Sequence, residues 1–295
     1  MKIGYPCINQ SIGKKTITTF RLGSYSESKL RQSIEYNLNN LYEILQYNID
    51  HGLYFFRISS DIIPFASHPI FDFQWKDFFA KKMLQIGQLI KENEIRISMH
   101  PDQFVLLNSP NPSIIDNSIR ELEYQSSFLD ELGLNNNAKL QIHVGGVYQN
   151  KEESIKRFIR TYKKLLPDRV KSRLVIENDD FRYDLTDCLR INEEIGIPII
   201  LDVFHNECMG QFPLRKAIAL AGKTWKKDDG VLMLDYSHQQ INSRKGKHTN
   251  SLDHDLFIQF LIATKGLDFD VMLEIKDKEK SAIRAKLILD RINLN

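Results

Sequence analysis

The chain has 295 residues, of which 42% are hydrophobic and 26% are charged, and its formal net charge is +2. This composition is sufficient for a packed core and excludes an extensively disordered chain, whereas a charge so close to neutral neither requires nor excludes a nucleic-acid partner. The 3 cysteines are far apart, which excludes a disulfide framework and a paired-cysteine zinc site and favours a reducing compartment.

Short β-rich runs follow one another along the chain, separated by longer segments with helical periodicity. The predicted strands cover residues 2–7, 55–60, 96–100, 139–144, 174–177, 197–204, 231–236 and 270–275. The first helical segment, residues 28–52, has apolar residues at three- and four-residue steps and ends at Gly52. Before it, the Thr- and Ser-rich residues 14–27 are predicted to form a long loop.

Strictly alternating strands and helices predict parallel strands joined by helical crossovers. Eight strand–helix pairs are the number that a TIM barrel needs, so we predict an α/β fold in which residues 1–295 form a single (β/α)8 TIM-barrel domain. A doubly wound open sheet is the alternative, but no Gly-x-Gly-x-x-Gly pattern follows the first strand. In a TIM barrel the active site lies at the C-terminal ends of the strands.

The predicted strand ends carry histidines and carboxylates. The histidines at or just beyond these ends are His68, His100, His143, His205, His238 and His248. The carboxylates are Glu177, Asp202, Asp235 and Glu274. Unpaired carboxylates on one rim would repel each other, and a cluster of cations removes that repulsion. Imidazole and carboxylate ligands suit Zn²⁺ or Mn²⁺, and two or three such ions about 3.5–4 Å apart activate a water and neutralise the leaving oxygen in phosphodiester hydrolysis.

Two further features lie on the same predicted rim. Tyr5 is near the end of the first strand and is followed by Pro6. The basic loop of residues 243–247 precedes His248, and it is either an ordinary solvated loop or a phosphate contact that includes Lys247.

Several stretches along nearly the whole chain form a specific set. They include RISSDIIPFASHP (residues 57–69), HPDQF (residues 100–104), LVIENDD (residues 174–180), PIILDVFHNE (residues 198–207) and VMLEIKDKEKSA (residues 271–282). Together they resemble the ultraviolet-damage endonuclease family, TIM-barrel enzymes that are related to endonuclease IV and to xylose isomerase-like barrels. The resemblance therefore implies the same fold as the alternation of strands and helices.

The resemblance also implies roles for individual residues. Positions that match the family's metal site are His68, His100, His143, Glu177, Asp202, His205, His248 and Glu274. Among them Glu177 is expected to bridge metal ions, and the expected catalytic residues are Glu177, His68, His205 and Tyr5. Gln103 and Phe104 match a pair that wedges into DNA beside the lesion, where stacking needs only the aromatic ring. Tyr5 and Asn9 match residues near the lesion and the cleavage site, and Lys247 is a further expected DNA contact.

The seventh strand departs from the family pattern. Family members often have Lys-x-His there, whereas this chain has Met233 and Asp235 at the corresponding positions. Asp235 is the favoured replacement ligand because it shares one strand face with Met233 and Ser237, and His238 is the alternative. Metal number or preference is therefore expected to differ from relatives.

The leading hypothesis is a metal-dependent DNA repair endonuclease that cuts double-stranded DNA immediately 5′ to cyclobutane pyrimidine dimers and 6-4 photoproducts, with abasic sites as a further candidate substrate. Two or three divalent ions are expected, with Mn²⁺ preferred over Zn²⁺ or Mg²⁺. The alternatives are an apurinic-site endonuclease, a metal-dependent sugar isomerase or epimerase, and a damage-binding protein without activity. With no signal-peptide pattern and no apolar run near the roughly 20 residues of a membrane span, we expect a cytoplasmic, nucleoid-associated monomer with no membrane partner.

Overall fold

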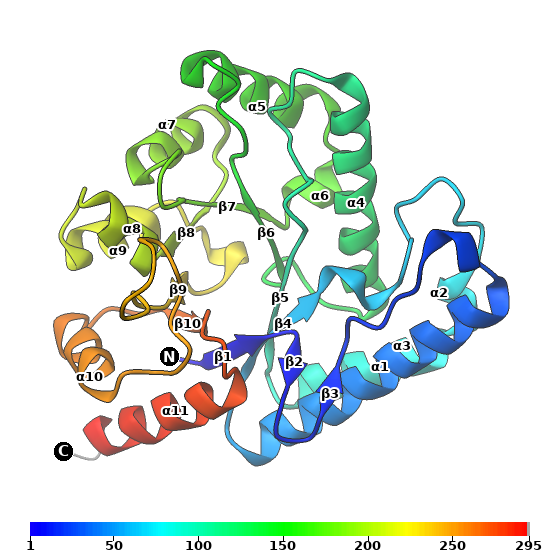
Figure 1. The fold of residues 1–295 in the computed structure, drawn as a ribbon, viewed down its shortest axis with the longest axis horizontal. Coiled ribbons are helices and arrows are strands. Elements are labelled where there is room, and N and C mark those ends of the chain that lie inside the picture. Colours follow the sequence, from blue (N-terminus) through cyan, green and yellow to red (C-terminus); the bar gives the residue numbers. More distant parts are fainter. Residues whose placement is uncertain (294–295) are drawn as a thin grey trace.

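Parallel strands close into a barrel at the centre of the computed structural model, which describes residues 1–293 (Figure 1). The barrel strands are β1 (Ile3–Pro6), β4 (Phe55–Ser59), β5 (Arg96–His100), β6 (Lys139–His143), β7 (Leu174–Glu177), β8 (Ile199–Asp202), β9 (Met233–Tyr236) and β10 (Asp270–Leu273). Each strand pairs with its neighbours along the chain, and β1 closes the ring by pairing with both β4 and β10. The predicted (β/α)8 TIM barrel is confirmed.

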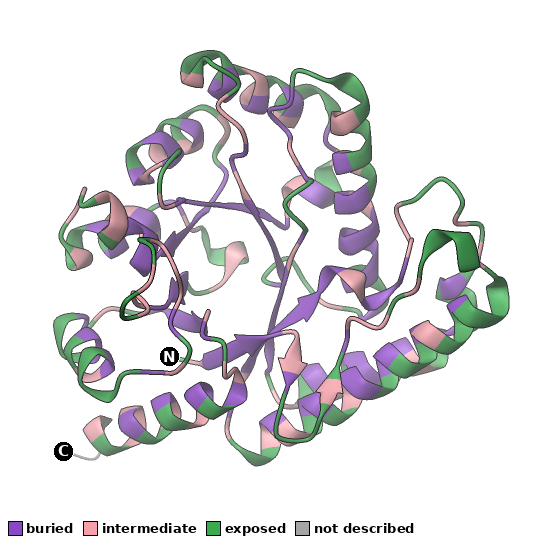
Figure 2. Ribbon diagram, in the orientation of Figure 1, coloured by how far each residue is buried: buried purple, intermediate pink, exposed green. Residues whose placement is uncertain are grey.

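Helices surround the barrel and cover its outer face (Figure 1). The longer ones are α1 (Glu27–Asp50), α3 (Ala80–Glu92), α4 (Pro112–Glu131), α5 (Lys151–Leu165), α7 (Leu185–Ile195), α9 (Leu214–Gly222), α10 (His254–Ala263) and α11 (Glu279–Asn293). The shorter ones are α2 (Trp75–Phe78), α6 (Asp168–Lys171) and α8 (Val203–Met209). Buried residues follow the strands and the inner helix faces, while the outer helix faces are exposed (Figure 2). No helix in the described part of the chain is long and apolar enough to cross a membrane.

Helix α1 illustrates how the sequence pattern produces this arrangement. Ser26 caps its N-terminus by accepting a hydrogen bond from the backbone N–H of Lys29 at 3.3 Å. Its apolar stripe is fully buried in the main core from Leu30 to Leu45 and partly buried at Ile49. The chain leaves the helix through Gly52, whose φ of +67° is a left-handed conformation that suits glycine.

Two predicted segments differ from the structure. The predicted loop of residues 14–27 contains β3 (Lys14–Lys15), which pairs with β2 (Ile8–Asn9), and a 3-10 turn (Leu22–Ser24). The predicted strand of residues 197–204 is too long, because α8 begins directly after Asp202. The Asp202 carboxylate accepts a hydrogen bond from the backbone N–H of His205 at 2.7 Å and so caps this helix. His205 therefore lies on the first turn of a helix and not in a loop.

The barrel interior is built in layers. One buried apolar cluster, separate from the main core, consists of Phe55, Val175, Ile200, Met233 and Met272. Two residues further along each of these strands stands a charged residue, and these are Arg57, Glu177, Asp202, Asp235 and Glu274. Because residues two apart share a strand face, the charged layer rests directly on the apolar layer, which excludes water from below. Truncating a buried phenylalanine in such a layer costs about 3–5 kcal/mol of stability.

Candidate active site

Four imidazoles and four carboxylates meet at the C-terminal mouth of the barrel. Candidate ligand groups are His100–His143–Glu177, Asp202–His205–His248 and Glu177–Asp202–Asp235. Within each group the ligand atoms lie within 4.8 Å of one another. A cavity of about 670 Å³ opens over them, and its lining includes all four imidazoles and Glu274. The structure thus brings together the residues that the sequence assigned to six different strands.

Glu177 lies at the centre of this arrangement. One carboxylate oxygen, Oε2, is 3.5 Å from His100 Nε2 and 3.7 Å from His143 Nε2, while Oε1 is 3.3 Å from His205 Nδ1. Burial alone would raise the pKa of Glu177, but the surrounding imidazoles outweigh it and hold that pKa well below its usual range. Glu177 therefore lies among histidines of two ligand groups, which favour its anionic form.

Backbone carbonyls orient three of the imidazole rings. The Nδ1 atom lies 2.9 Å from the Pro101 carbonyl in His100, 3.0 Å from the Asn178 carbonyl in His205 and 3.0 Å from the Glu274 carbonyl in His248. In the neutral ring, which is the form that binds a metal, an Nδ1–H that donates to a carbonyl leaves the free lone pair on Nε2. Such a contact is the usual way in which a protein fixes a metal-binding histidine.

Two buried polar atoms of this site have no hydrogen bond among residues 1–293, although one of them, Asp202 Oδ2, lies 3.4 Å from His205 Nδ1. Asp202 uses Oδ1 to cap α8, but its Oδ2 has no hydrogen bond, and neither has Nδ1 of His143. Burial, followed by repulsion from Glu177, Glu274 and other carboxylates, raises the pKa of Asp202 well above its usual range despite the nearby His205. Buried unpartnered groups are costly, and a divalent cation would supply the missing partner. Nitrogen and oxygen donors without thiolates fit Mn²⁺, Zn²⁺ or a similar ion.

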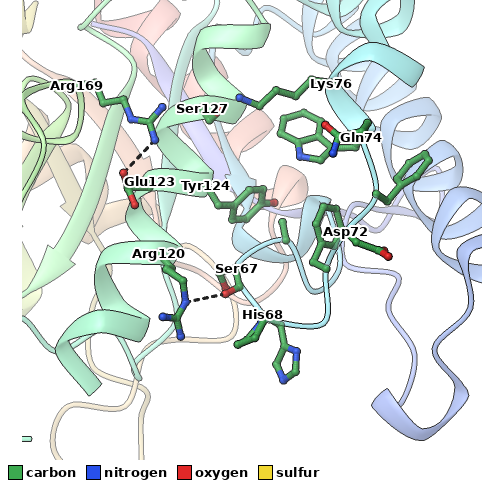
Figure 3. A pocket seen from close by; sticks show the side chains of 15 residues that line it. Ser67, His68, Asp72, Gln74, Lys76, Arg120, Glu123, Tyr124, Ser127 and Arg169 are labelled. Carbon is green, nitrogen blue, oxygen red and sulfur yellow. Dashed lines mark hydrogen bonds and ion pairs between the residues drawn. The ribbon is translucent and has the colours of Figure 1, made fainter. Parts of the chain in front are cut away.

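His68 lies apart from this cluster. Its exposed side chain borders a second hollow of about 540 Å³ between residues 66–76 and α4 (Figure 3). There Arg120 Nε donates to the Ser67 carbonyl at 3.3 Å, and Arg169 pairs with Glu123 at 3.2 Å. Within the described part of the chain His68 belongs to none of the three ligand groups. Its expected catalytic and metal-binding roles stay predictions, and this structure does not bring it to the centre.

Tyr5 and Asn9 are also not where the sequence analysis expected them. Both side chains are fully buried. The Tyr5 hydroxyl donates to Asn48 Oδ1 at 2.6 Å and accepts from Asn9 Nδ2 at 2.8 Å. Burial raises the pKa of Tyr5 far above its usual range, so the phenol stays protonated. In this structure Tyr5 and Asn9 are buried and hydrogen-bonded toward α1, and their expected roles near the lesion and the cleavage site stay predictions.

The expected DNA-contact residues that follow β5 and β9 lie at the surface. Gln103 lines the cavity above the ligand groups, and Phe104 beside it is 50% exposed. Lys247 joins Arg244 and Lys276 around a shallow basic hollow that adjoins His248. The exposed Phe104 ring and the basic side chains therefore flank the cluster at one face of the barrel.

Two residues of the centre were missed by the sequence analysis. Arg57 is 3% exposed and pairs with Asp235 at 2.7 Å and with Glu274. Gln141 donates from Nε2 to Glu177 Oε2 at 2.6 Å. The sequence did contain a signal for Arg57, because a charged residue inside the otherwise largely apolar strand Phe-Phe-Arg-Ile-Ser needs a buried partner. His238, the alternative ligand on the seventh strand, instead accepts a hydrogen bond from the Asp253 backbone N–H at 3.1 Å.

Comparison with known proteins assigns the chain to a family. The sequence profile described as UV-endonuclease UvdE matches residues 1–293. The UV DNA damage endonuclease of Clostridium perfringens (strain 13 / Type A) is 40% identical to this chain, over 99% of the chain and 72% of the relative. The chain belongs to the UV DNA damage endonuclease family. Another family member, from Bacillus cereus (strain G9842), is 34% identical over 91% of the chain and 86% of the relative.

Solved structures agree with this assignment. The crystal structure of SacUVDE has a TM-score of 0.95 and 42% identity, and the match covers 99% of both chains. Endonuclease IV from Thermus thermophilus, at 14% identity, has a TM-score of 0.59 over 86% of this chain and 95% of its own, a likeness of fold. Membership of the family makes this protein a UV-damage repair endonuclease, with DNA as its substrate.

Metal binding is predicted to release protons. Burial lowers the pKa of His205, but Asp202 and then Glu177 outweigh it and raise that pKa to about 11. At pH 7 the metal-free His205 is therefore protonated, and a ligating imidazole must be neutral. We expect calorimetric titration with Mn²⁺ at pH 7, in buffers of different ionisation enthalpy, to report at least about one proton released per chain. His205→Gln should release about one fewer, and identical heats in all buffers would contradict the assignment.

Proposed function

We propose that the protein hydrolyses the phosphodiester immediately 5′ to cyclobutane pyrimidine dimers and 6-4 photoproducts in double-stranded DNA, and that this activity depends on divalent metal ions. The observation that carries the proposal is the pairing of two ligand groups, each with two histidines and one carboxylate, at the mouth of one cavity. Mn²⁺ is the proposed ion, because imidazole and carboxylate donors suit it.

The two groups would divide the cations between them. His100, His143 and Glu177 would hold one ion, and Asp202, His205 and His248 would hold the other. When bound, such ions lower the pKa of a water molecule and stabilise negative charge on the reacting phosphate and its leaving oxygen. Glu177, whose oxygens approach histidines of both groups, would bridge the two sites.

The chain's own residues would orient the substrate around that centre. Lys247, with Arg244 and Lys276, supplies positive charge for the DNA backbone next to His248. Gln103 and Phe104 would enter the duplex beside the lesion. Their distance from the cut bond would be set by the short stretch from the β5 end, where the buried Pro101 follows His100 with its φ restricted.

Recognition of the lesion would depend on how easily the damaged dinucleotide unstacks from the duplex. A photoproduct weakens stacking and pairing locally, so turning the damaged nucleotides outward costs less than in intact DNA. The Phe104 ring would fill the space that they leave, and the Gln103 amide would meet the exposed base edges. This use of an exposed Gln–Phe pair favours a nuclease over a sugar isomerase or epimerase on the same barrel.

The direct test is a nicking assay with Mn²⁺ on a duplex that carries one cyclobutane dimer, run beside an abasic duplex and an undamaged one. We expect a single nick on the 5′ side of the dimer and no cutting of the undamaged strand. Glu177→Gln should lower the rate by at least roughly a hundredfold, because it removes the shared anionic ligand. Equal cutting of damaged and undamaged duplexes would exclude lesion specificity, and cutting of the abasic duplex alone would support an apurinic-site endonuclease.

A second test concerns Phe104, whose ring is proposed to stack in the DNA duplex. Phe104→Leu should slow cutting of the dimer duplex by about 5- to 150-fold, since stacking of one base on an aromatic ring contributes about 1–3 kcal/mol. Phe104→Tyr keeps the ring and should retain most of the rate. Phe78→Leu, at a similarly exposed position on α2, is the matched control and should have no effect. Full activity of the Phe104→Leu variant would mean that Phe104 does not stack on DNA.

A further inference from the structure

The third candidate ligand group differs from the other two. It contains carboxylates alone, and two of its members, Glu177 and Asp202, already belong to the first and second groups. Asp235 is the one member that belongs to neither of the other two groups. We propose that the guanidinium of Arg57 stands in the place of a third metal ion, so that the centre binds two ions and Asp235 is a partner of Arg57 and not a metal ligand. This inference rests on the metal dependence proposed above.

Arg57 extends from β4 into the middle of the charged layer. Its Nη2 donates to Asp235 Oδ1 and to Gln141 Oε1, each at 2.7 Å, and its Nη1 donates to Glu274. The planar guanidinium thus joins residues of β6 and β9 with Glu274, which directly follows β10. A guanidinium stays charged at every physiological pH, so this cation is a permanent part of the fold.

Asp235 has both of its oxygens occupied. Oδ1 accepts from Arg57, and Oδ2 accepts from Gln141 Nε2. Because Gln141 Oε1 faces Arg57, its amide can be oriented in only one way, with Nε2 toward Glu177 and Asp235. Asp202 differs, since its buried Oδ2 accepts no hydrogen bond among the described residues and has only the His205 imidazole nearby, with Nδ1 at 3.4 Å. Of the two aspartates, only Asp202 therefore has an oxygen that is not hydrogen-bonded and is open to a cation.

The balance of charge favours two ions. Four carboxylates face the centre, and Arg57 compensates one of them, which leaves three negative charges with neutral histidines. Two divalent ions change this to a single positive charge, which matches the single negative charge of a phosphodiester. A third divalent ion would add two more positive charges to a confined, partly buried site, where uncompensated charge is costly.

Metal content measured without DNA tests the proposal. The chain is loaded with Mn²⁺, freed of excess by desalting and assayed for bound manganese by mass spectrometry, with folding checked by circular dichroism. We expect two ions per chain for the wild type and two for Asp235→Asn. The matched control Asp202→Asn, an equally buried aspartate one strand away, should lose one ion. Loss of one ion by Asp235→Asn, or three ions in the wild type, would overturn the inference.

Arg57→Met tests the arginine itself. Removing the guanidinium frees Asp235 and Glu274, and a folded Arg57→Met chain should bind a third ion. A folded variant that still binds two ions would overturn the role of Arg57, and the Asp235→Asn result decides the matter if the variant does not fold. A wild type that binds no divalent ion would overturn this inference together with the proposed metal dependence. A wild type that binds two ions yet leaves photoproducts uncut would overturn the proposed function alone.

Discussion

Buried negative charge at the barrel mouth is the constraint on which the rest of the structure depends. Glu177, Asp202 and Asp235 are all removed from water, and an apolar layer lies directly beneath them. Such carboxylates persist only where positive charge and hydrogen-bond donors are arranged around them. One fixed cation, Arg57, supplies part of that charge, and the two ligand groups that contain histidines would hold the divalent cations of the proposed function. The cations that compensate the buried carboxylates would, under the proposed function, also take part in phosphodiester hydrolysis.

Much of this organisation could be predicted from the sequence, because it is local in the chain. The alternation of strands and helices predicted the barrel, and parallel strands bring their C-terminal ends to one rim. Strand-end residues such as His100, His143 and Glu177 could therefore be grouped without knowing any distance. Gln103 and Phe104 were singled out by the family resemblance, and the structure places them just beyond β5 at the surface.

What could not be predicted depends on contacts between distant segments. Arg57 reaches Asp235 and Glu274 across the barrel, and nothing in its own neighbourhood in the chain identifies those partners. Asp202 caps α8 through Oδ1, so the helix begins directly after it and the strand was predicted too long. Tyr5 looked like a rim residue, but its hydroxyl is held by Asn48 of α1 and by Asn9, which buries it.

Crystals grown with Mn²⁺ and measured at the manganese absorption edge would test the two-ion centre directly, because anomalous scattering locates each ion independently of activity. Two peaks are expected. One should be bonded to His100, His143 and Glu177 and the other to Asp202, His205 and His248, with Asp235 still bound to Arg57. A peak bonded to Asp235, or no peak at the barrel mouth, would contradict it.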